Sequence, residues 1–551
     1  YRGWLVRRVC ALLAAWSWKV PADSPGDLPA RICSSKRLQH VPSSLPPGSR
    51  GERKEKILQI LAQIQAPLCL LLLRLCHWAL LKLLRCLFLS LQLHRGQLEM
   101  VLRASSTPGL PLVFLSRHKS RLDGLLLSFV LFSQGLGVPR VAVGGQPCSP
   151  GLRALLRHLG GIFLPERMEQ DKELLEAVLT TYVEELLRCS QPLLLFLEEP
   201  PMSLQPSGVA EQWLALVYRA VRDGALPDAL LVPVGISYDL VPGGAWQDGA
   251  QDGQPLGMGA SLWAVCQALC QSHGCVRVDF AQPFSLQVQA KGQPGGAVPV
   301  LRAGGGGGLE GSCVLLGMLE TKELLLVEPG SDRMAPAGCP PCCPSPGCCP
   351  RGGSHPSTSP CPADAVACSA IMAVGITSAL LLHRHPQGVL LAQLLEDFAW
   401  LLEELLLRQQ DVGFSGQLRA LVQHSLSLLG PHLTFCHLPS RGDLLVVPKA
   451  SAEARRELSQ HSAAILPVFA SEAVGACAIR ALLLELLPFL GASPGLPSVV
   501  LSEEELCHKV LQLLQLLPPN LLGLQPCQPL DCLSQDVVDK LVLCGLLEAQ
   551  E

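Results

Sequence analysis

The sequence predicts an α/β domain at the centre of the chain, with largely helical regions on either side. Between residues 106 and 288, short apolar runs alternate with helical patterns, which is typical of a sheet covered by helices. Residues 365–551 have helical patterns, and residues 1–105 combine a linker with leucine-rich helices. Residues 289–364 are rich in glycine, cysteine and proline, so we expect a disordered linker there.

The composition indicates a membrane-associated protein that does not cross the bilayer many times. Hydrophobic residues make up 49% of the chain, charged residues 16%, and the mean hydropathy is +0.33. Few apolar runs reach the roughly 20 residues that a spanning helix needs. The net charge of −3 does not suggest nucleic-acid binding. The scattered 24 cysteines suit a reducing compartment better than a disulfide framework.

The first 105 residues are expected to contain a membrane-associating segment. Tryptophans beside cations in residues 1–20 are typical of a membrane interface, and nearly as typical of an arm that packs on a domain. Because the chain begins at Tyr1 and not at Met, a further N-terminal segment is expected to precede it. Residues 21–51 have the composition of a linker.

Residues 67–93 are almost continuous leucine with a polar stripe. At 100° per residue the polar side chains share an arc of about 140°. This pattern favours equally a helix in the plane of lipid headgroups and a packed helix with one hydrated face. The stripe consists of Arg74, His77, Lys82, Arg85 and Gln92.

The elements of the central region follow from hydrophobic periodicity. Residues 111–115, 193–197 and 230–236 are short apolar runs that predict buried strands. Residues 122–132 and 172–189 predict helices.

The C-terminal region contains three long apolar segments. Residues 365–382 carry no charge, so they predict either a borderline membrane span or a buried helix. Residues 389–408 predict an amphipathic helix. Residues 463–490 are apolar, but Glu472 and Arg480 interrupt them and argue against a simple span. The cysteines of the preceding linker match no zinc module in their spacing, so no metal site is predicted.

His118 is the strongest candidate for a reacting group, with Asp123 following it. Both lie at the corner between the first predicted strand and its helix, where loops of α/β folds often carry chemistry. A carboxylate that binds the far nitrogen of an imidazole selects its tautomer and makes it a better base. Such a pair can remove a proton from a substrate hydroxyl. By itself the pattern is weak, because an ordinary loop pair has the same spacing.

Three further segments could complete a site around this pair. A glycine pair ahead of an arginine permits close backbone approach and could bind phosphate. A glutamate ends one central strand, and a proline and glycine in another suit a narrow channel. A turn, a capped strand end and an edge strand are the simpler interpretations. The residues are Gly161, Phe163, Arg167, Glu198, Pro233 and Gly235.

In order and spacing, these four blocks resemble the glycerolipid acyltransferase family, which esterifies glycerol 3-phosphate and its monoacyl product. Residues 2–8, 96–101, 274–286 and 412–416 are similar to segments of the mitochondrial glycerol-3-phosphate acyltransferases. The resemblance covers most of the chain apart from residues 289–364 and the tail. It makes a chance pairing of the histidine and aspartate untenable.

The resemblance implies a mixed sheet flanked by helices and an acyl-CoA-dependent transfer at the cytosolic face of the mitochondrial outer membrane. His118 would be the general base for the sn-1 hydroxyl of glycerol 3-phosphate, and Asp123 would orient and stabilise it. The product would be lysophosphatidic acid for phospholipid and triacylglycerol synthesis, with acyl-CoA as co-substrate and no cofactor or metal. The implied substrate-binding residues are Arg167, Lys172, Glu198, Gly161, Phe163, Pro233 and Gly235.

Two blocks depart from the family pattern. The second usually ends in a run of arginines, but here Glu166 precedes a single Arg167. The third usually continues with glycine, arginine and serine, but here Glu199, Pro201 and Met202 take their places. An arginine–phosphate contact is worth about 1.5–3 kcal/mol. We therefore expect the phosphate substrate to bind roughly tenfold to hundredfold more weakly.

This pattern of loss resembles the second mitochondrial isoform of the family, which is associated with germ cells and piRNA production. Two hypotheses follow. The chain is either an acyltransferase with weakened or altered acceptor binding, acting on glycerol 3-phosphate or lysophosphatidic acid, or a largely non-catalytic scaffold that recruits protein partners. Membrane lipid is an expected partner in both, and direct nucleic-acid binding is not predicted.

Overall fold

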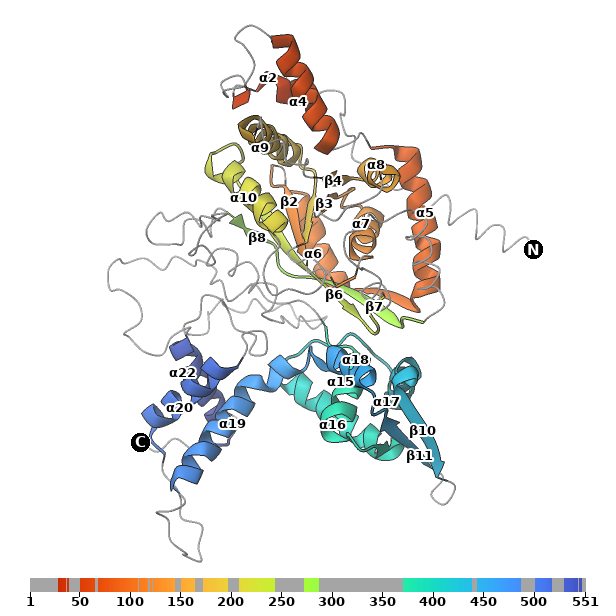
Figure 1. Ribbon diagram of the computed structural model, residues 1–551, viewed down its shortest axis with the longest axis vertical. Helices are drawn as coiled ribbons and strands as arrows, with labels where there is room; N and C mark the ends of the chain where they lie inside the picture. Colours follow the sequence, from red (N-terminus) through yellow and green to blue (C-terminus); the bar gives the residue numbers. More distant parts are fainter. Residues whose placement is uncertain are drawn as a thin grey trace, which may run out of the picture.

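The structure is a computed structural model, in which a sheet with its helices lies above a separate C-terminal region (Figure 1). It describes residues 28–35, 37–38, 50–64, 68–107, 109–116, 119–120, 122–143, 150–163, 172–196, 208–242, 272–286, 370–438, 443–486, 501–517, 530–543 and 545–547.

The central sheet is mixed, as the family resemblance implied. Its strands follow the order β1-β7-β6-β2-β5-β3-β4, and β8 pairs with β6. Strands β6, β2, β5, β3 and β4 are mutually parallel, whereas β7 is antiparallel to β6 and parallel to β1. The strands are β1 (Ser90–Leu93), β2 (Leu112–Ser116), β3 (Arg140–Val143), β4 (Gly161–Phe163), β5 (Leu193–Phe196), β6 (Leu230–Tyr238), β7 (Cys275–Phe280) and β8 (Phe284–Ser285).

Helices cover both faces of this sheet because its central strands are apolar on both sides. In β2, Val113 and Leu115 belong to one buried cluster, while Phe114 belongs to another. The first cluster joins α9 (Lys172–Arg188) and α10 (Gly208–Arg222), and the second joins α7 (Asp123–Ser133). Helix α8 (Pro150–His158) leads into β4, and α6 (Arg95–Ser105) packs beside β7. The strands predicted at 111–115, 193–197 and 230–236 and the helices at 122–132 and 172–189 are confirmed within about two residues.

Elements that precede residue 105, the predicted start of the central domain, also pack into that domain. Helices α2 (Leu28–Ser34) and α4 (Arg50–Ile64) contribute Ile32 and Ile60 to the same buried cluster as α9. Strand β1 also precedes this boundary, yet it pairs with β7 in the central sheet. The predicted linker at 21–51 contains Leu28 and Ile32, whose apolar side chains pack in the core when α2 forms. Its overall Pro- and Ser-rich composition did not indicate this helix. Residues 1–20 and 289–364 lie outside the described residues.

The leucine-rich helix is shorter than predicted, because α5 ends at Leu87 and β1 follows. One member of its polar stripe, His77, is buried against α7, where its ring lies 4.5 Å from that of Phe132. Burial lowers the pKa of His77, so it does not contribute to a basic face. Leu71 and Leu75 are instead 58% and 51% exposed. The helix therefore packs on the domain and also presents leucines to solvent.

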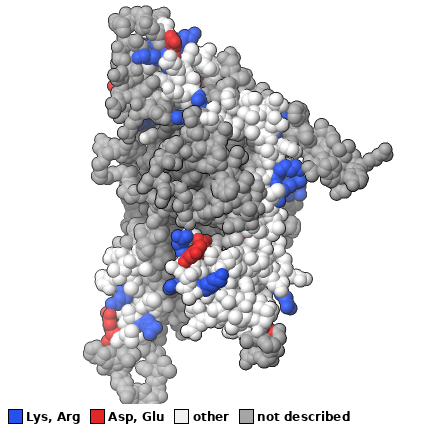
Figure 2. All heavy atoms as spheres, turned by 45° about the vertical axis from the view of Figure 1, so that its right-hand side comes forward, with Lys and Arg blue, Asp and Glu red and all other residues white. Residues whose placement is uncertain are grey.

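On this side, the described surface carries few charged side chains. Figure 2 brings forward the right-hand side of Figure 1, where α5 lies, and shows Lys, Arg and a few Asp and Glu side chains among largely uncharged described residues. Among the described residues, one helix, α19 (Leu466–Leu486), is long and apolar enough to cross a membrane, and 28% of the apolar stretch is buried. Buried core helices can meet the same criteria, so length and composition support a span only weakly.

The C-terminal region is predominantly helical, but it also contains a three-stranded sheet that was not predicted. This sheet has the order β10-β11-β9, formed by β10 (Leu433–Leu438), β11 (Asp443–Pro448) and β9 (Val389–Leu390). Within the uncharged segment 365–382, α15 (Ala373–Ala379) is fully buried and runs into a π-helical turn, Leu380–Arg384. Of the two alternatives for this segment, the described part forms a buried helix.

The remaining C-terminal helices enclose two buried clusters. The first is formed around α15 with α16 (Leu391–Leu407), α17 (Leu418–Leu428) and α18 (Ala452–Ser462). The second lies between α19, α20 (Glu503–Leu516) and α22 (Leu530–Leu543). A short 3₁₀ turn, Gly430–His432, precedes β10. The amphipathic helix predicted at 389–408 is confirmed as α16.

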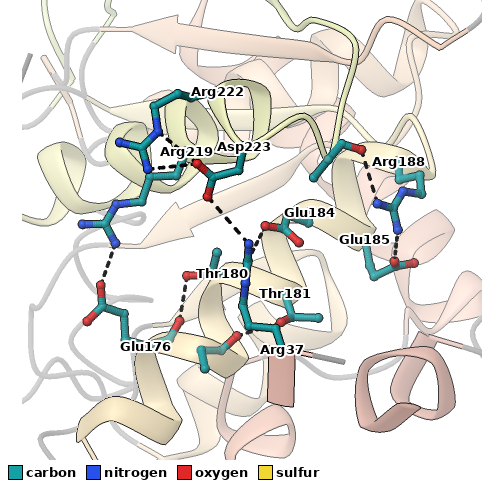
Figure 3. A network of polar contacts seen from close by, with 12 residues as sticks. Arg37, Glu176, Thr180, Thr181, Glu184, Glu185, Arg188, Arg219, Arg222 and Asp223 are labelled. Carbon is teal, nitrogen blue, oxygen red and sulfur yellow. Dashed lines mark hydrogen bonds and ion pairs between the residues drawn. The ribbon is translucent and has the colours of Figure 1, made fainter. Parts of the chain in front are cut away.

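Two polar clusters lie in different surroundings on the central sheet and its helices. On the outer side, arginines pair with carboxylates across α9, α10 and the segment after α2 (Figure 3); we call this the helix network. Between the sheet and the C-terminal region, Arg277 of β7 binds Asp279, Asp411 and the carbonyl of Val412; we call this the strand cluster. The helix network consists of Arg37, Glu176, Glu184, Arg219, Arg222 and Asp223.

Candidate active site

The candidate site lies where the carboxyl ends of three parallel strands meet. Strand β2 is flanked by β5 and β6, with Ser116 opposite Phe196 and Val234. The chain leaves β2 at Ser116 and enters α7 at Asp123. The ring of Phe196 lies beside Gly124 in the first turn of α7, 3.6 Å from where a Cβ would stand. In parallel α/β sheets, this edge is where ligands bind.

The Asp123 carboxylate is fully buried and accepts three hydrogen bonds at the corner between β2 and α7. Its Oδ2 accepts hydrogen bonds from the backbone N–H groups of Lys119 and Ser120, at 2.6 and 2.8 Å. Its Oδ1 accepts a hydrogen bond from the Tyr238 hydroxyl, at 2.6 Å. The aspartate therefore folds the loop after His118 back onto α7 and joins it to the end of β6.

Two further contacts attach the same loop to β6 and to the segment that follows it. The ammonium of Lys119 donates to the carbonyl of Ile236 at 2.7 Å, and the Ser120 hydroxyl donates to the carbonyl of Pro242 at 2.7 Å. The N–H of Asp123 donates to the carbonyl of Ser120 at 2.9 Å, closing a turn. A loop held at this many points is pre-organised, which favours a reacting group carried on it.

Burial dominates the electrostatics of this corner. It raises the pKa of Asp123 to about 6, and the hydrogen bonds from Tyr238, Ser120 and Lys119 oppose that rise. Burial and the neighbouring carboxylate raise the pKa of Tyr238 well above its usual value, so Tyr238 remains a hydrogen-bond donor. At a pH of about 7, a carboxyl with this pKa is ionised in roughly nine of ten molecules.

Sequence reasoning did not assign Tyr238 to the site. The tyrosine belongs to the apolar strand that it recognised, but the contact with Asp123 spans 115 residues. The only local signal was a polar Ser-Tyr-Asp ending of a buried strand, Ser237 to Asp239.

Several residues predicted for the site lie outside the described residues. These include His118, Arg167 and Glu198, and the side chain of Lys172, whose backbone begins α9. Glu198 follows β5, the strand next to β2, and Arg167 follows β4, which is three strands from β2. Their roles stay predictions.

Gly161 and Phe163 are buried in β4, at the edge of the sheet. A Cβ on Gly161 would stand 3.0 Å from the carbonyl oxygen of Leu156 in α8, so the glycine permits this helix to approach the strand. The guanidinium of Arg153 lies 5.0 Å from the centre of the Phe163 ring. These contacts give both residues a packing role beside their predicted substrate role.

Pro233 and Gly235 lie on β6 directly beside the candidate site. Pro233 stands opposite Leu115 of β2, and Gly235 stands opposite Asp279 of β7. Because side chains alternate along a strand, both residues face away from the side on which Tyr238 meets Asp123. Strand β6 therefore lies at the site, but Tyr238, and neither Pro233 nor Gly235, is the residue of this strand that binds Asp123.

A buried carboxylate stabilises a positive charge that forms next to it, as on a histidine base that takes a proton from a hydroxyl. The described residues place such a carboxylate, that of Asp123, at this corner. With Tyr238 and two amides already on the carboxylate, its position is constrained before substrate binds.

Comparisons with known proteins show which proteins this chain is similar to. A family model described as "Acyltransferase" matches residues 97–201, and one described as "Glycerol-3-phosphate acyltransferase C-terminal region" matches residues 363–551. The human protein named "Glycerol-3-phosphate acyltransferase 2, mitochondrial" is 42% identical over 590 residues, covering 100% of this chain and 69% of its own length. Its mouse counterpart is 43% identical over 586 residues, with the same coverage. The human "Glycerol-3-phosphate acyltransferase 1, mitochondrial" is 32% identical over 574 residues, covering 100% and 68%.

Proposed function

This chain belongs to the mitochondrial glycerol-3-phosphate acyltransferase family, and we propose that it transfers an acyl group from acyl-CoA to the sn-1 hydroxyl of glycerol 3-phosphate. One observation carries the proposal. The buried carboxylate of Asp123 binds the loop that follows His118 and is itself bound by Tyr238. That is the support a histidine base requires at this corner.

In the proposed reaction, His118 accepts the proton of the sn-1 hydroxyl, and Asp123 stabilises the imidazolium. The hydroxyl oxygen forms a bond to the thioester carbonyl carbon, giving a tetrahedral intermediate. Its collapse breaks the carbon–sulfur bond, and the leaving thiolate of CoA takes the proton from the imidazolium. The products are lysophosphatidic acid and free CoA. Aligning two bound substrates supplies much of the rate, with acyl-CoA as co-substrate and no cofactor.

Binding of the acceptor is proposed to be the weak step. Glycerol 3-phosphate is a dianion, and the sequence has Glu166 and Glu199 where phosphate-binding blocks of the family stand. Arg167 and Lys172 are the cations left to bind phosphate there, with Glu198, Gly161, Phe163, Pro233 and Gly235 completing the proposed substrate-binding residues. Lysophosphatidic acid is the alternative acceptor.

The proposed location is the mitochondrial outer membrane, with the active site facing the cytosol. The relatives are named as mitochondrial proteins. The exposed leucines of α5, Leu71 and Leu75, and the apolar helix α19 support contact with lipid.

The direct test compares purified wild type with His118→Ala, using labelled glycerol 3-phosphate or lysophosphatidic acid and several acyl-CoAs. We expect the substitution to lower turnover by roughly 10²–10⁴-fold, the usual contribution of a general base. His437→Ala, which removes an exposed imidazole in β10, is the matched control and should retain activity. Equal background turnover in wild type and His118→Ala would exclude the enzymatic function.

A second test concerns the acceptor. Restoring the family pattern with Glu199→Gly and Pro201→Arg should lower the KM for glycerol 3-phosphate by about tenfold, the size of one charge-assisted contact. An unchanged KM would mean that the missing arginine does not limit binding.

A scaffold function is the second candidate, favoured by those same replacements in the phosphate-binding blocks. In that case the fold recruits protein partners at the mitochondrial surface, and a role in piRNA production is the expectation carried by the resemblance. Partner recruitment would then be unchanged in His118→Ala, whereas loss of recruitment would tie it to the catalytic base.

A further inference from the structure

Three side chains that can bind metal converge where the sheet meets the C-terminal region. Asp239 follows β6, Cys275 begins β7, and His424 lies in α17. One oxygen of the aspartate, the sulfur of the cysteine and one nitrogen of the histidine all lie within 4.8 Å of one another. The three come from separate elements, so no spacing in the sequence could reveal them.

Backbone hydrogen bonds hold Asp239 and Cys275 next to each other. The Cys275 N–H donates to Asp239 Oδ2 at 2.7 Å, and the Asp239 N–H donates to the Cys275 carbonyl at 3.0 Å. Gly274 has a φ of +67°, and a Cβ there would stand 2.5 Å from Asp239 Oδ2 and 2.8 Å from Leu428. Only glycine therefore leaves room for both the carboxylate and the packing of α17.

The distances and donor types suit zinc. His424 Nε2 lies 3.2 Å from Asp239 Oδ2. Two such ligands on a tetrahedral zinc, each about 2.1 Å from the ion, stand roughly 3.4 Å apart. Thiolate and imidazole favour zinc over magnesium or calcium, which prefer oxygen.

Charge and burial point the same way. Asp239 is only 4% exposed. A dication among a carboxylate, a thiolate and a neutral imidazole gives a cluster with no net charge, which lowers the cost of burying it. Ser90 hydrogen-bonds Cys275 and would support the thiolate as an outer partner.

We propose that Asp239, Cys275 and His424 bind one zinc ion, which clamps the acyltransferase sheet to the C-terminal region. Water takes the fourth position, as in zinc sites with three protein ligands. Binding releases the thiol proton of Cys275 to solvent. Because Tyr238, the last residue of β6, directly precedes Asp239, the clamp would also restrain the end of that strand.

The test follows the Cys275 thiol individually, since other cysteines of the chain could also bind zinc. The full chain is alkylated with and without added zinc, and each cysteine is quantified by mass spectrometry of its peptide. Zinc should slow alkylation of Cys275 by about tenfold or more, because a metal-bound thiolate is a poorer nucleophile. Cys477, an exposed thiol on α19, is the internal reference and should react at an unchanged rate.

Variants separate a metal clamp from a simple hydrogen bond. His424→Gln keeps an N–H that can donate to Asp239 but removes the imidazole, so zinc should no longer protect Cys275 at the concentration that protects wild type. His437→Ala should leave protection intact. Equal reactivity of wild-type Cys275 with and without zinc overturns the proposal, and so does undiminished protection in His424→Gln. The alkylation rate is measured without enzymatic turnover, so the result is independent of the proposed acyl transfer.

Discussion

The strand cluster and the helix network use the same kinds of ion pair in opposite surroundings. In the strand cluster, Asp279 is fully buried and the Arg277 side chain is only 11% exposed. In the helix network, Arg219 and Glu176 are 44% and 58% exposed (Figure 3). Water screens the exposed ion pair of the helix network but not the buried pair of the strand cluster. Breaking the two pairs should therefore change the free energy of unfolding by amounts that differ several-fold.

The Asp123 corner belongs with the buried set. There too, burial raises a carboxyl pKa to about 6, and a few specific donors oppose it. At Asp123 and in the strand cluster alike the charge lies away from water, so solvent cannot replace a partner that is lost.

The largest effect is expected at Asp123. Asp123→Asn keeps the size of the side chain but removes the charge that stabilises the imidazolium, so kcat should fall roughly 10²–10⁴-fold. Steady-state assays check this, with thermal unfolding recorded to separate activity from folding. Undiminished turnover in a folded variant would remove the aspartate from the mechanism.

The next effect is on stability. Arg277→Met leaves Asp279 without its guanidinium partner, and breaking a buried pair in this way costs about 3–5 kcal/mol. Urea unfolding at neutral pH measures the loss, and Arg219→Met in the helix network is the control. A loss no larger than that of the control would contradict the contrast between buried and exposed pairs.

The pH dependence of this variant follows from Asp279. Burial raises the pKa of Asp279 from 3.8 to about 6, against the opposing effect of Arg277. Its protonation therefore stabilises the fold fully below about pH 4, and this contribution is lost as pH rises through about 6. The deficit of Arg277→Met should be largest above pH 6 and shrink on acidification. A deficit independent of pH would point to lost packing instead.

A smaller effect is expected at Tyr238. Tyr238→Phe removes the donor to Asp123 Oδ1, so the pKa of Asp123 should rise further and less of the carboxylate should be ionised at neutral pH. We expect a fall in kcat of about tenfold, the value of one hydrogen bond to a charged group. The acidic limb of the pH–kcat profile should move to higher pH, with KM nearly unchanged.

Tyr218→Phe, on α10 and away from the site, is the matched control for Tyr238→Phe. An acidic limb that does not move would show that the tyrosine has only a packing role.

The smallest effect is expected in the helix network. A double-mutant cycle of Arg219→Ala and Glu176→Ala should give a coupling energy of about 0.5 kcal/mol or less, reduced further by salt. The ion pair is 2.6 Å long, but both side chains are well exposed. A coupling energy above about 1 kcal/mol would mean that the helix network is not an ordinary surface pair.

Local pattern was sufficient for much of the fold. The runs that form β2, β5 and β6 were recognisable as strands because uninterrupted apolar residues suit a sheet buried on both faces. Helices α7, α9 and α16 followed from length and periodicity. The His118–Asp123 pair is a weak pattern by itself, and it became recognisable through the family resemblance of the blocks around it.

Local sequence pattern did not predict burial or strand pairing that depends on segments far apart in the sequence. The sequence placed His77 in a basic stripe, but in the structure it is buried against α7. Helix α2 lay in a Pro- and Ser-rich stretch whose composition indicated a linker, yet Ile32 is fully buried. The strands β10 and β11 stabilise each other as a hairpin, which neither run specifies by itself.

Sequence alone identifies the family, the α/β character of the centre and the corner that carries His118 and Asp123. Those features rest on neighbouring residues, whose spacing and apolar character act locally. The folded chain is needed to show that Tyr238 supports Asp123, that Arg277 binds the C-terminal region, and that Asp239, Cys275 and His424 meet. Burial and charge pairing depend on which distant surfaces come together, and that is a property of the packed chain.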